Sequence, residues 1–154
     1  MNETYYFPDA STVYQNLGNV VAPGAISGAA GIYSLQINDT TITASNFAYA
    51  STWTPTSFNG FVLTDESNSP FTGVTVDPAT NMAGFSASNV TFTPNQILVN
   101  WQGLSFNTST IVTLDLNGAS PTPEPGFMWC GLIVAGVLAI VKLRRVAEQR
   151  RTAA

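Results

Sequence analysis

The first 117 residues alternate between apolar and polar side chains in short runs, and residues that favour turns separate these runs. Tyr33, Leu35 and Ile37 are predicted to share the buried face of one strand, because successive side chains of a strand point to opposite sides of its sheet. By the same alternation, Val90 and Phe92 are predicted to face inward from a second strand. A period of two residues indicates strands with one face in a core and the other in water.

The strand pattern occurs in eight segments, which are Thr4–Phe7, Ile32–Ile37, Thr41–Tyr49, Phe58–Thr64, Gly73–Val76, Val90–Thr93, Gln96–Trp101 and Thr110–Leu116. No helical period precedes residue 126, so the pattern predicts an all-β domain over residues 1–117, an antiparallel β-sandwich that is jelly-roll-like. In the last strand, Val112, Leu114 and Leu116 are predicted to pack inward. The glycine- and alanine-rich stretch Gly18–Gly31 is predicted to be a long, mobile loop.

The pattern changes after residue 117. Residues 118–125 read Gly-Ala-Ser-Pro-Thr-Pro-Glu-Pro and are predicted to form an extended linker, because proline cannot donate to a hydrogen-bond ladder. Residues 126–143 are apolar except for Lys142. At roughly 1.5 Å per residue, a helix over this segment is about 27 Å long, which is enough to cross a membrane. Residues 144–154 form a basic tail.

The basic residues predict the orientation of this transmembrane helix. All five lie at its end or beyond it, namely Lys142, Arg144, Arg145, Arg150 and Arg151. Since basic residues are retained on the cytoplasmic side of a membrane, we expect the tail inside the cell and the β-sandwich outside it, as an ectodomain. The side chains predicted to anchor the helix in lipid are Phe127, Trp129, Leu132, Ile133, Val137, Leu138 and Ile140.

Charge and cysteine content exclude several functions. Residues 1–141 contain eight acidic side chains but no Lys, Arg or His, and the whole chain has a formal net charge of -4. A domain without cations cannot neutralise phosphates, which excludes nucleic-acid and nucleotide binding. The only cysteine, Cys130, lies in the apolar segment, so the ectodomain has no disulfide and no thiol cluster. We expect no cofactor and no metal.

The end of the chain carries three elements in order: Pro123-Glu124-Pro125, an apolar helix that follows at once, and an arginine cluster. Together they resemble the tripartite PEP-CTERM sorting signal, a tail that is also labelled an ice-binding-protein C-terminal domain. The resemblance implies recognition of Pro123, Glu124 and Pro125 by an exosortase, a membrane-embedded cysteine transpeptidase. It also implies single-pass transit through a bacterial inner membrane, followed by the cell surface or the extracellular matrix. An ordinary proline-rich stalk before a membrane anchor is the alternative.

Two further observations bear on this resemblance. The segments Phe58–Phe61, Gly73–Asp77, Asn95–Phe106 and Val112–Leu116 also resemble the β-sandwich ectodomain of many proteins with such a tail. Export needs a signal peptide, but Met1–Phe7 has neither a basic nor an apolar region. We therefore expect either a start codon upstream of Met1 or a broken gene.

An enzyme built from the ectodomain would have to use carboxylates, in the manner of a glycosidase. The candidates are Asp65, Glu66, Asp77 and Asp115. The first three fall in turn-like segments and Asp115 alternates outward on its strand, so we expect no enzyme and no catalytic residue. Asp65, Asp77 and Asn81 would be the first places to look for calcium, but no Asp-x-Asp-x-Asp spacing occurs.

Binding is a better supported prediction than catalysis. Aromatic residues outside the core, such as Trp53, Tyr49 or Trp101, could stack on sugar rings. Trp53, between two threonines, is the most loop-like of these and is predicted to contact a glycan. Trp101 alternates with Ile97 and Val99 and is predicted to lie in the core.

Thr-x-Thr pairs, such as Thr41 with Thr43 and Thr91 with Thr93, suggest an ice-binding face. Two threonines on the same face of a strand can present a regular array of hydroxyl and methyl groups. Such pairs more often form the solvent face of a strand, and here they lack a fixed sequence period.

These features predict a non-enzymatic cell-envelope or extracellular-matrix protein that is exported and sorted through its C-terminal signal. Its expected partners are the exosortase, the lipid bilayer and an exopolysaccharide. The alternative is a surface carbohydrate-binding module. A glycan hydrolase and an ice-binding protein are less favoured.

Overall fold

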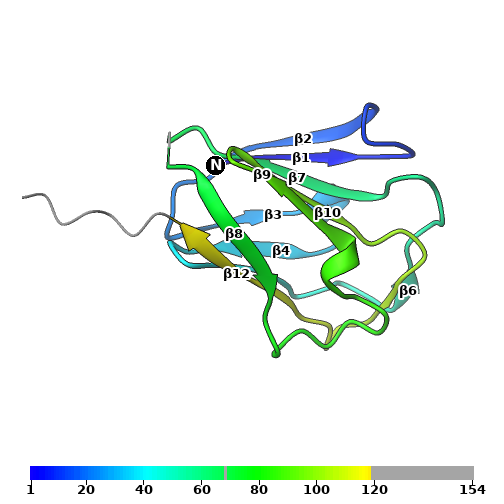
Figure 1. Ribbon diagram of the computed structural model, residues 1–154. Helices are drawn as coiled ribbons and strands as arrows, with labels where there is room; N and C mark the ends of the chain where they lie inside the picture. The colour runs from blue at the N-terminus through cyan, green and yellow to red at the C-terminus, as the bar shows by residue number, and fades with distance from the viewer. Residues whose placement is uncertain (68, 119–154) are drawn as a thin grey trace, which may run out of the picture. The chain divides into compact units, whose positions relative to one another are not determined.

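The computed structural model describes residues 1–67 and 69–118, which form antiparallel sheets (Figure 1). The first sheet has the order β2 (Val13–Asn19), β1 (Asn2–Tyr6), β7 (Gly60–Thr64), β10 (Gln96–Asn100) and β9 (Val90–Thr93). The second has the order β3 (Gly24–Ser27), β4 (Ser34–Ile37), β5 (Thr41–Ser45), β12 (Val112–Gly118) and β8 (Phe71–Val76). A small third sheet pairs β6 (Ser51–Thr52) with β11 (Ser105–Phe106). Two short 3-10 turns, η1 (Ala29–Gly31) and η2 (Ala87–Asn89), complete the fold.

The two five-stranded sheets face each other, so the predicted all-β, sandwich-like fold is confirmed for this part of the chain (Figure 1). Most of the predicted linker, and all of the predicted transmembrane helix and basic tail, lie outside the described residues. Within residues 1–67 and 69–118, no helix is long and apolar enough to cross a membrane.

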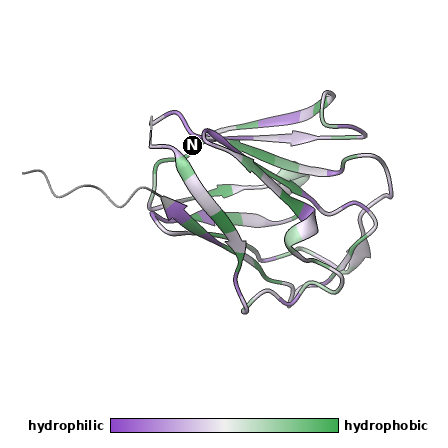
Figure 2. Cartoon of the chain, viewed as in Figure 1, coloured by the Kyte–Doolittle hydropathy of each residue, from purple (hydrophilic) through white to green (hydrophobic). Residues whose placement is uncertain are grey.

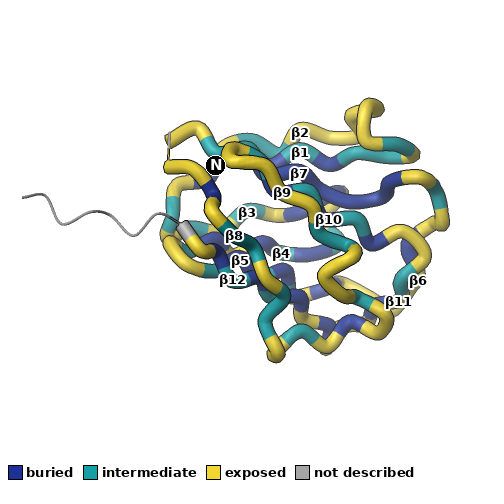
Figure 3. Tube along the Cα trace, in the orientation of Figure 1, coloured by how far each residue is buried: buried dark blue, intermediate teal, exposed yellow. Residues whose placement is uncertain are grey.

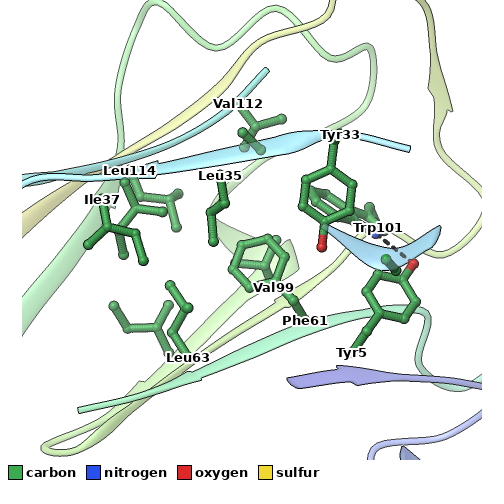
Figure 4. Close-up of a cluster of buried hydrophobic side chains, with 14 of the residues drawn as sticks. Tyr5, Tyr33, Leu35, Ile37, Phe61, Leu63, Val99, Trp101, Val112 and Leu114 are labelled. Atoms are coloured by element: carbon green, nitrogen blue, oxygen red, sulfur yellow. Dashed lines mark hydrogen bonds between the residues drawn. The ribbon is translucent and has the colours of Figure 1, made fainter. Parts of the chain in front are cut away.

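The core lies between the sheets and follows the predicted alternation. Phe61, Leu63 and Val99 of the first sheet point toward Leu35 and Leu114 of the second (Figure 4). The predicted inward faces of Ile32–Ile37 and Thr110–Leu116 are confirmed, because every second residue from Tyr33 to Ile37 and from Val112 to Leu116 is buried. Burying a side chain of this size contributes about 1.5–3 kcal/mol, so these central strands hold the sheets together.

Burial falls toward the edges of the first sheet (Figure 3). Strand β2 has exposed or half-exposed residues throughout, and much of it is hydrophilic in Figure 2. At the opposite edge, Phe92 of β9 is 40% exposed, so the prediction that it faces inward is wrong. The reason is its position, because an edge strand has a neighbour on one side only and lies at the margin of the opposing sheet.

The prediction of a long loop over Gly18–Gly31 is also wrong. The stretch contains the end of β2, all of β3 and the turn η1. Its glycines are required by the backbone geometry. Gly18 has φ +95° beside a bulge in β2. A side chain at Gly24 would overlap the carbonyl oxygen of Val21. Backbone hydrogen bonds to β1 and β4 hold β2 and β3 in place. Their side chains therefore need not show the alternation of apolar and polar residues that predicts a strand.

Strand β5 ends earlier than the predicted segment Thr41–Tyr49. It stops at Ser45 because Asn46 adopts a left-handed backbone with φ 54°. Asparagine tolerates this conformation better than most residues. The chain then turns and delivers Phe47 into the core, where it is 2% exposed.

Gly60 is expected to be indispensable for the pairing of β7 with β10. A Cβ at this position would overlap the backbone carbonyl of Val99, which cannot move without breaking the ladder. We predict that Gly60→Ala lowers the free energy of unfolding by at least about 2 kcal/mol, measured by chemical denaturation. Gly73→Ala is the matched control, because its Cβ would meet only the exposed side chain of Asn117, at 3.1 Å. Equal stability of the two variants would contradict this role.

Candidate functional site

An aromatic cluster fills one end of the sandwich core, with Trp101 at its centre. The Trp101 indole stacks on Trp53, with ring centroids 5.3 Å apart and planes 8° apart. Tyr33 and Phe61 meet Trp101 edge-on, each with centroids 5.1 Å away. Aromatic pairs at such distances stabilise the fold by more than the burial of their apolar surface alone. The prediction that Trp101 lies in the core is confirmed, since it is fully buried.

Trp53 belongs to the same cluster, so the prediction that it lies outside the core is wrong, although it does follow β6 outside any strand. Its side chain is only 7% exposed. The backbone explains this: Trp53 N–H donates to the carbonyl of Leu104, and Gly103 N–H donates back to the carbonyl of Trp53, each at 2.9 Å. These bonds continue the pairing of β6 with β11 and hold the Trp53 segment against the core.

A chain of buried hydrogen bonds runs beside the stacked indoles. Trp101 Nε1 donates to the Tyr5 hydroxyl at 3.1 Å (Figure 4). That hydroxyl donates to Asn59 Oδ1 at 2.6 Å. Asn59 Nδ2 then donates to the carbonyl of Thr54 at 3.1 Å. Burial raises the pKa of Tyr5 well above its usual range, so the phenol stays protonated. Trp53 Nε1, by contrast, is buried and has no hydrogen-bond partner among the described residues.

Among the described residues one carboxyl group, that of Glu3, is fully buried. Tyr33 donates its hydroxyl to Glu3 Oε1 at 2.8 Å, whereas Oε2 has no partner in the described part of the chain. Residues 1–141 offer no Lys, Arg or His to neutralise it. Loss of water raises the pKa of Glu3 to about 7, against the opposing effect of the Tyr33 hydrogen bond. The fold therefore keeps a partly protonated acid in its core at neutral pH.

A cleft of about 240 Å³ opens next to the aromatic cluster, where β1, β2, η1 and β6 meet. Its residues fall into three groups. Aromatic rings come from Tyr5, Phe7, Tyr14, Tyr49, Trp53 and Phe106. Polar groups come from Ser51, Thr52, Thr54 and Asn59. Small or aliphatic side chains come from Ala29, Ala30 and Ile32.

Two tyrosines form the accessible aromatic surface of this cleft. Tyr14 is 60% exposed and meets Tyr5 and Phe7 edge-on, with centroids 6.2 and 6.4 Å away. Tyr49 is 50% exposed and lies 5.9 Å from the ring of Phe106. Both keep a ring in contact with the cluster while much of the side chain remains in water, which is typical of residues that stack on ligands.

A β-bulge sets the position of Tyr14. Tyr5 pairs with Gln15 and Tyr6 pairs with Val13, so Tyr14 is an extra residue on β2 with no partner on β1. A bulge bends its strand and redirects a side chain, so alternation along the sequence could not identify Tyr14 as a ligand contact. The nearest sequence signal was the density of aromatic residues between Tyr5 and Tyr14.

The sequence did indicate Tyr49, as one of the aromatic residues that could stack on a sugar. The loop-like neighbours of Trp53 favoured that residue instead. The structure favours Tyr49 over Trp53 as a ligand contact, because the Tyr49 side chain is half exposed whereas that of Trp53 is nearly buried.

The predicted carboxylate candidates are not brought together. Asp65 accepts hydrogen bonds from the backbone N–H groups of Ser67 and Ser69, at 3.0 and 3.1 Å. Desolvation opposes the charged form, but these bonds and the Ser67 hydroxyl outweigh it, and the pKa of Asp65 lies below its usual range. Glu66 accepts from Asn19 at 3.0 Å.

Asp77 and Asp115 likewise have local positions. Asp77 accepts from the N–H of Ala79 at 2.6 Å, as a turn residue does. Asp115 is half-exposed on β12, opposite Thr41 and Thr75 of the neighbouring strands. Within residues 1–67 and 69–118, no group of three His, Cys, Asp or Glu side chains could hold a metal ion.

The threonine pairs are divided among different surfaces. Thr41 and Thr43 lie on β5 of the second sheet, where the hydroxyls of Thr43 and Thr113 are 3.2 Å apart. Thr91 and Thr93 lie on β9, at the edge of the first sheet. The pairs therefore do not line up in one array over the described residues.

Comparison with protein-family models, curated proteins and solved structures finds no match. The site with the most distinctive chemistry is the cleft, because it combines exposed tyrosine rings, hydroxyl groups and a buried indole N–H without a partner among the described residues.

The buried carboxyl group predicts an unusual pH dependence of stability. The pKa of Glu3 is higher in the folded chain, about 7, than the ordinary 4.5, so the folded state binds the proton more tightly. The contribution of Glu3 to stability is then fully present below about pH 4.5 and is lost as the pH rises through 7, by about 3 kcal/mol in total. The chain has no histidine that would titrate in the same window. Chemical denaturation of the full-length chain between pH 4 and 8 measures this loss.

Glu3→Gln is the matched variant, because glutamine keeps an acceptor for the Tyr33 hydroxyl but cannot ionise. We expect its stability to vary little between pH 4.5 and 8 and to exceed that of the parent chain at pH 8. Parallel stability curves for the two chains would show that Glu3 is not the buried acid described above.

Proposed function

We propose that this chain is a non-enzymatic, exported protein of the cell envelope or extracellular matrix, sorted through its C-terminal segment. The observation that carries the proposal is the order of Pro123-Glu124-Pro125, the apolar run 126–143 and the arginine cluster. In this proposal the run forms a single transmembrane helix behind a jelly-roll-like ectodomain. The bilayer retains the chain in transit, with the basic tail in the cytoplasm.

The sorting motif suits recognition by a membrane-embedded exosortase. Two prolines restrict the backbone around Glu124 to an extended form, so little conformational entropy is lost when the tripeptide enters a protease groove. Glu124 supplies the only charge between Asp115 and Lys142. The exosortase would cleave near this motif and release the ectodomain to the cell surface or matrix.

Mass spectrometry of the mature C-terminus tests the sorting step. In cells with the exosortase we expect the apolar segment and basic tail to be lost, and in cells without it we expect them to remain. Pro125→Ala should block processing, whereas the matched control Pro121→Ala, which leaves the motif intact, should not. An intact arginine-rich tail in both strains would defeat the proposal.

The cleft supports a second candidate function, carbohydrate binding at the surface. Exposed tyrosine rings beside hydroxyl groups can stack on a sugar and bond its hydroxyls. This activity is compatible with the first, because binding an exopolysaccharide would hold a released ectodomain in the matrix. Trp53, the predicted glycan contact, lines the cleft but is nearly buried, so Tyr14 and Tyr49 are the better candidates for stacking.

Hydrolysis and ice binding have less support. A hydrolase would need cooperating carboxylates, but Asp65 and Asp77 accept hydrogen bonds within their own turns. An ice-binding protein would need a regular threonine array, and the described threonine pairs are dispersed. Neither activity is part of the proposal.

Substitution of the exposed tyrosines tests carbohydrate binding. On a glycan array with the full-length chain in detergent, we expect Tyr14→Ala or Tyr49→Ala to weaken saturable binding at least tenfold, since stacking area is lost. Phe92→Ala is the matched control, because Phe92 is an exposed aromatic residue on β9, the far edge of the same sheet from Tyr14. Trp53→Ala is unsuitable, since truncating a buried tryptophan costs about 3–5 kcal/mol of stability. Equal losses in the Tyr14 and Phe92 variants would contradict a role for the cleft.

A further inference from the structure

The side chains that line the cleft include no Lys, Arg, His, Asp or Glu. The side-chain charge of the described residues is of one sign, and the N-terminal ammonium group of Met1 is their only cation. The seven acidic side chains are Glu3, Asp9, Asp39, Asp65, Glu66, Asp77 and Asp115. A carboxylate or sulfate in the cleft would lose water without gaining a cation, and the summed field of the domain would repel it. The cleft therefore discriminates against anions.

The apolar surface of the cleft suits a ring with a C–H face. Tyr14 stands edge-on to Phe7, and Tyr49 stands beside Phe106, so exposed rings are available from two separate parts of the chain. Aromatic faces attract the C–H side of a pyranose but offer nothing to a strongly hydrated ion. The hydroxyls of Ser51 and Thr54, both exposed, can bond the hydroxyl edge of the same ring.

The buried indole of Trp53 adds a donor. Trp53 borders the cleft, and its Nε1 has no hydrogen-bond partner among the described residues. An indole N–H can only donate, and a buried donor without an acceptor is unfavourable, so an oxygen atom of a ligand would satisfy it. Asn59, which also lines the cleft, does not accept this N–H: its Oδ1 accepts from the Tyr5 hydroxyl, and its Nδ2 donates to the Thr54 carbonyl.

The size of the cleft limits the ligand. Its volume of about 240 Å³ lies below the roughly 300–1,000 Å³ typical of sites for drug-sized molecules. We propose that the cleft binds one uncharged sugar residue, such as the end of a neutral glycan chain, and rejects the corresponding uronic acid. This inference rests on the proposed carbohydrate-binding function and names the substrate class of the same site.

Pairs of sugars that differ only in charge test the proposal. The probes are glucose, galactose and mannose oligosaccharides, each beside the oligosaccharide of its uronic acid, titrated into the full-length chain in roughly 0.15 M salt, where distant surface charges are largely screened. We expect saturable binding of at least one neutral probe, with at least tenfold weaker binding of its uronic acid. Tyr14→Ala should lower the neutral affinity at least tenfold, and Phe92→Ala should not.

A substitution that adds a cation gives an independent measurement. Thr54 is exposed and lines the cleft, so Thr54→Arg should leave the core intact while placing a positive charge at the site. We expect this variant to bind the uronic-acid probe at least tenfold more tightly than the parent chain does, because arginine pairs with carboxylates in a bidentate manner. Thr54→Gln, which adds bulk without charge, is the control. An unchanged uronic-acid affinity in Thr54→Arg would overturn the proposed site.

The outcomes separate the two levels of inference. Equal or tighter binding of uronic acids by the parent chain, lost in Tyr14→Ala, would overturn the neutral-sugar inference and leave carbohydrate binding standing. Neutral binding that survives both Tyr14→Ala and Tyr49→Ala would place the ligand elsewhere and overturn the cleft. Binding of no saccharide at all would defeat both, while the sorting function would still be judged by the mature C-terminus.

Discussion

Two sheets that face each other must exclude water at the ends of the sandwich as well as along its middle, and here Trp101 meets that constraint at one end. Its indole contacts Tyr33 and Phe47 on the side of the second sheet and Phe61 on the first. Its N–H is bonded to Tyr5, so the ring has one orientation in which both packing and hydrogen bonding are satisfied. Because Trp53 stacks on that ring, the wall of the cleft depends on the same arrangement.

The polar groups of this core are satisfied to different extents. The hydrogen bonds from Trp101 to Tyr5, Asn59 and Thr54 form a complete network, which favours a single packing of the aromatic end. Glu3 and Trp53 each retain one polar atom without a partner in the described chain. A buried polar atom without a hydrogen-bond partner destabilises a fold, and Trp53, unlike Glu3, belongs to the residues that line the cleft.

Side-chain alternation was sufficient to predict the central strands, because Leu35, Val99 and Leu114 lie on faces that the opposing sheet covers. It was insufficient at the edges, where backbone ladders hold β2 and β3 with little help from side chains. Trp53 carried the local signals of a loop, but pairing with distant residues buried it. The cleft was beyond prediction because residues from Tyr5 to Phe106 meet there, and a bulge sets the position of Tyr14.

The absence of basic side chains from the described domain has a consequence for its resistance to proteolysis. Trypsin-like proteases require a lysine or arginine next to the bond that they cut, because an aspartate in their specificity pocket must be paired. The first such residue is Lys142, so a digest would leave residues 1–142 as one fragment however long the sandwich spent unfolded. Resistance to this class of secreted protease is thus a property of the composition and does not depend on the stability of the fold.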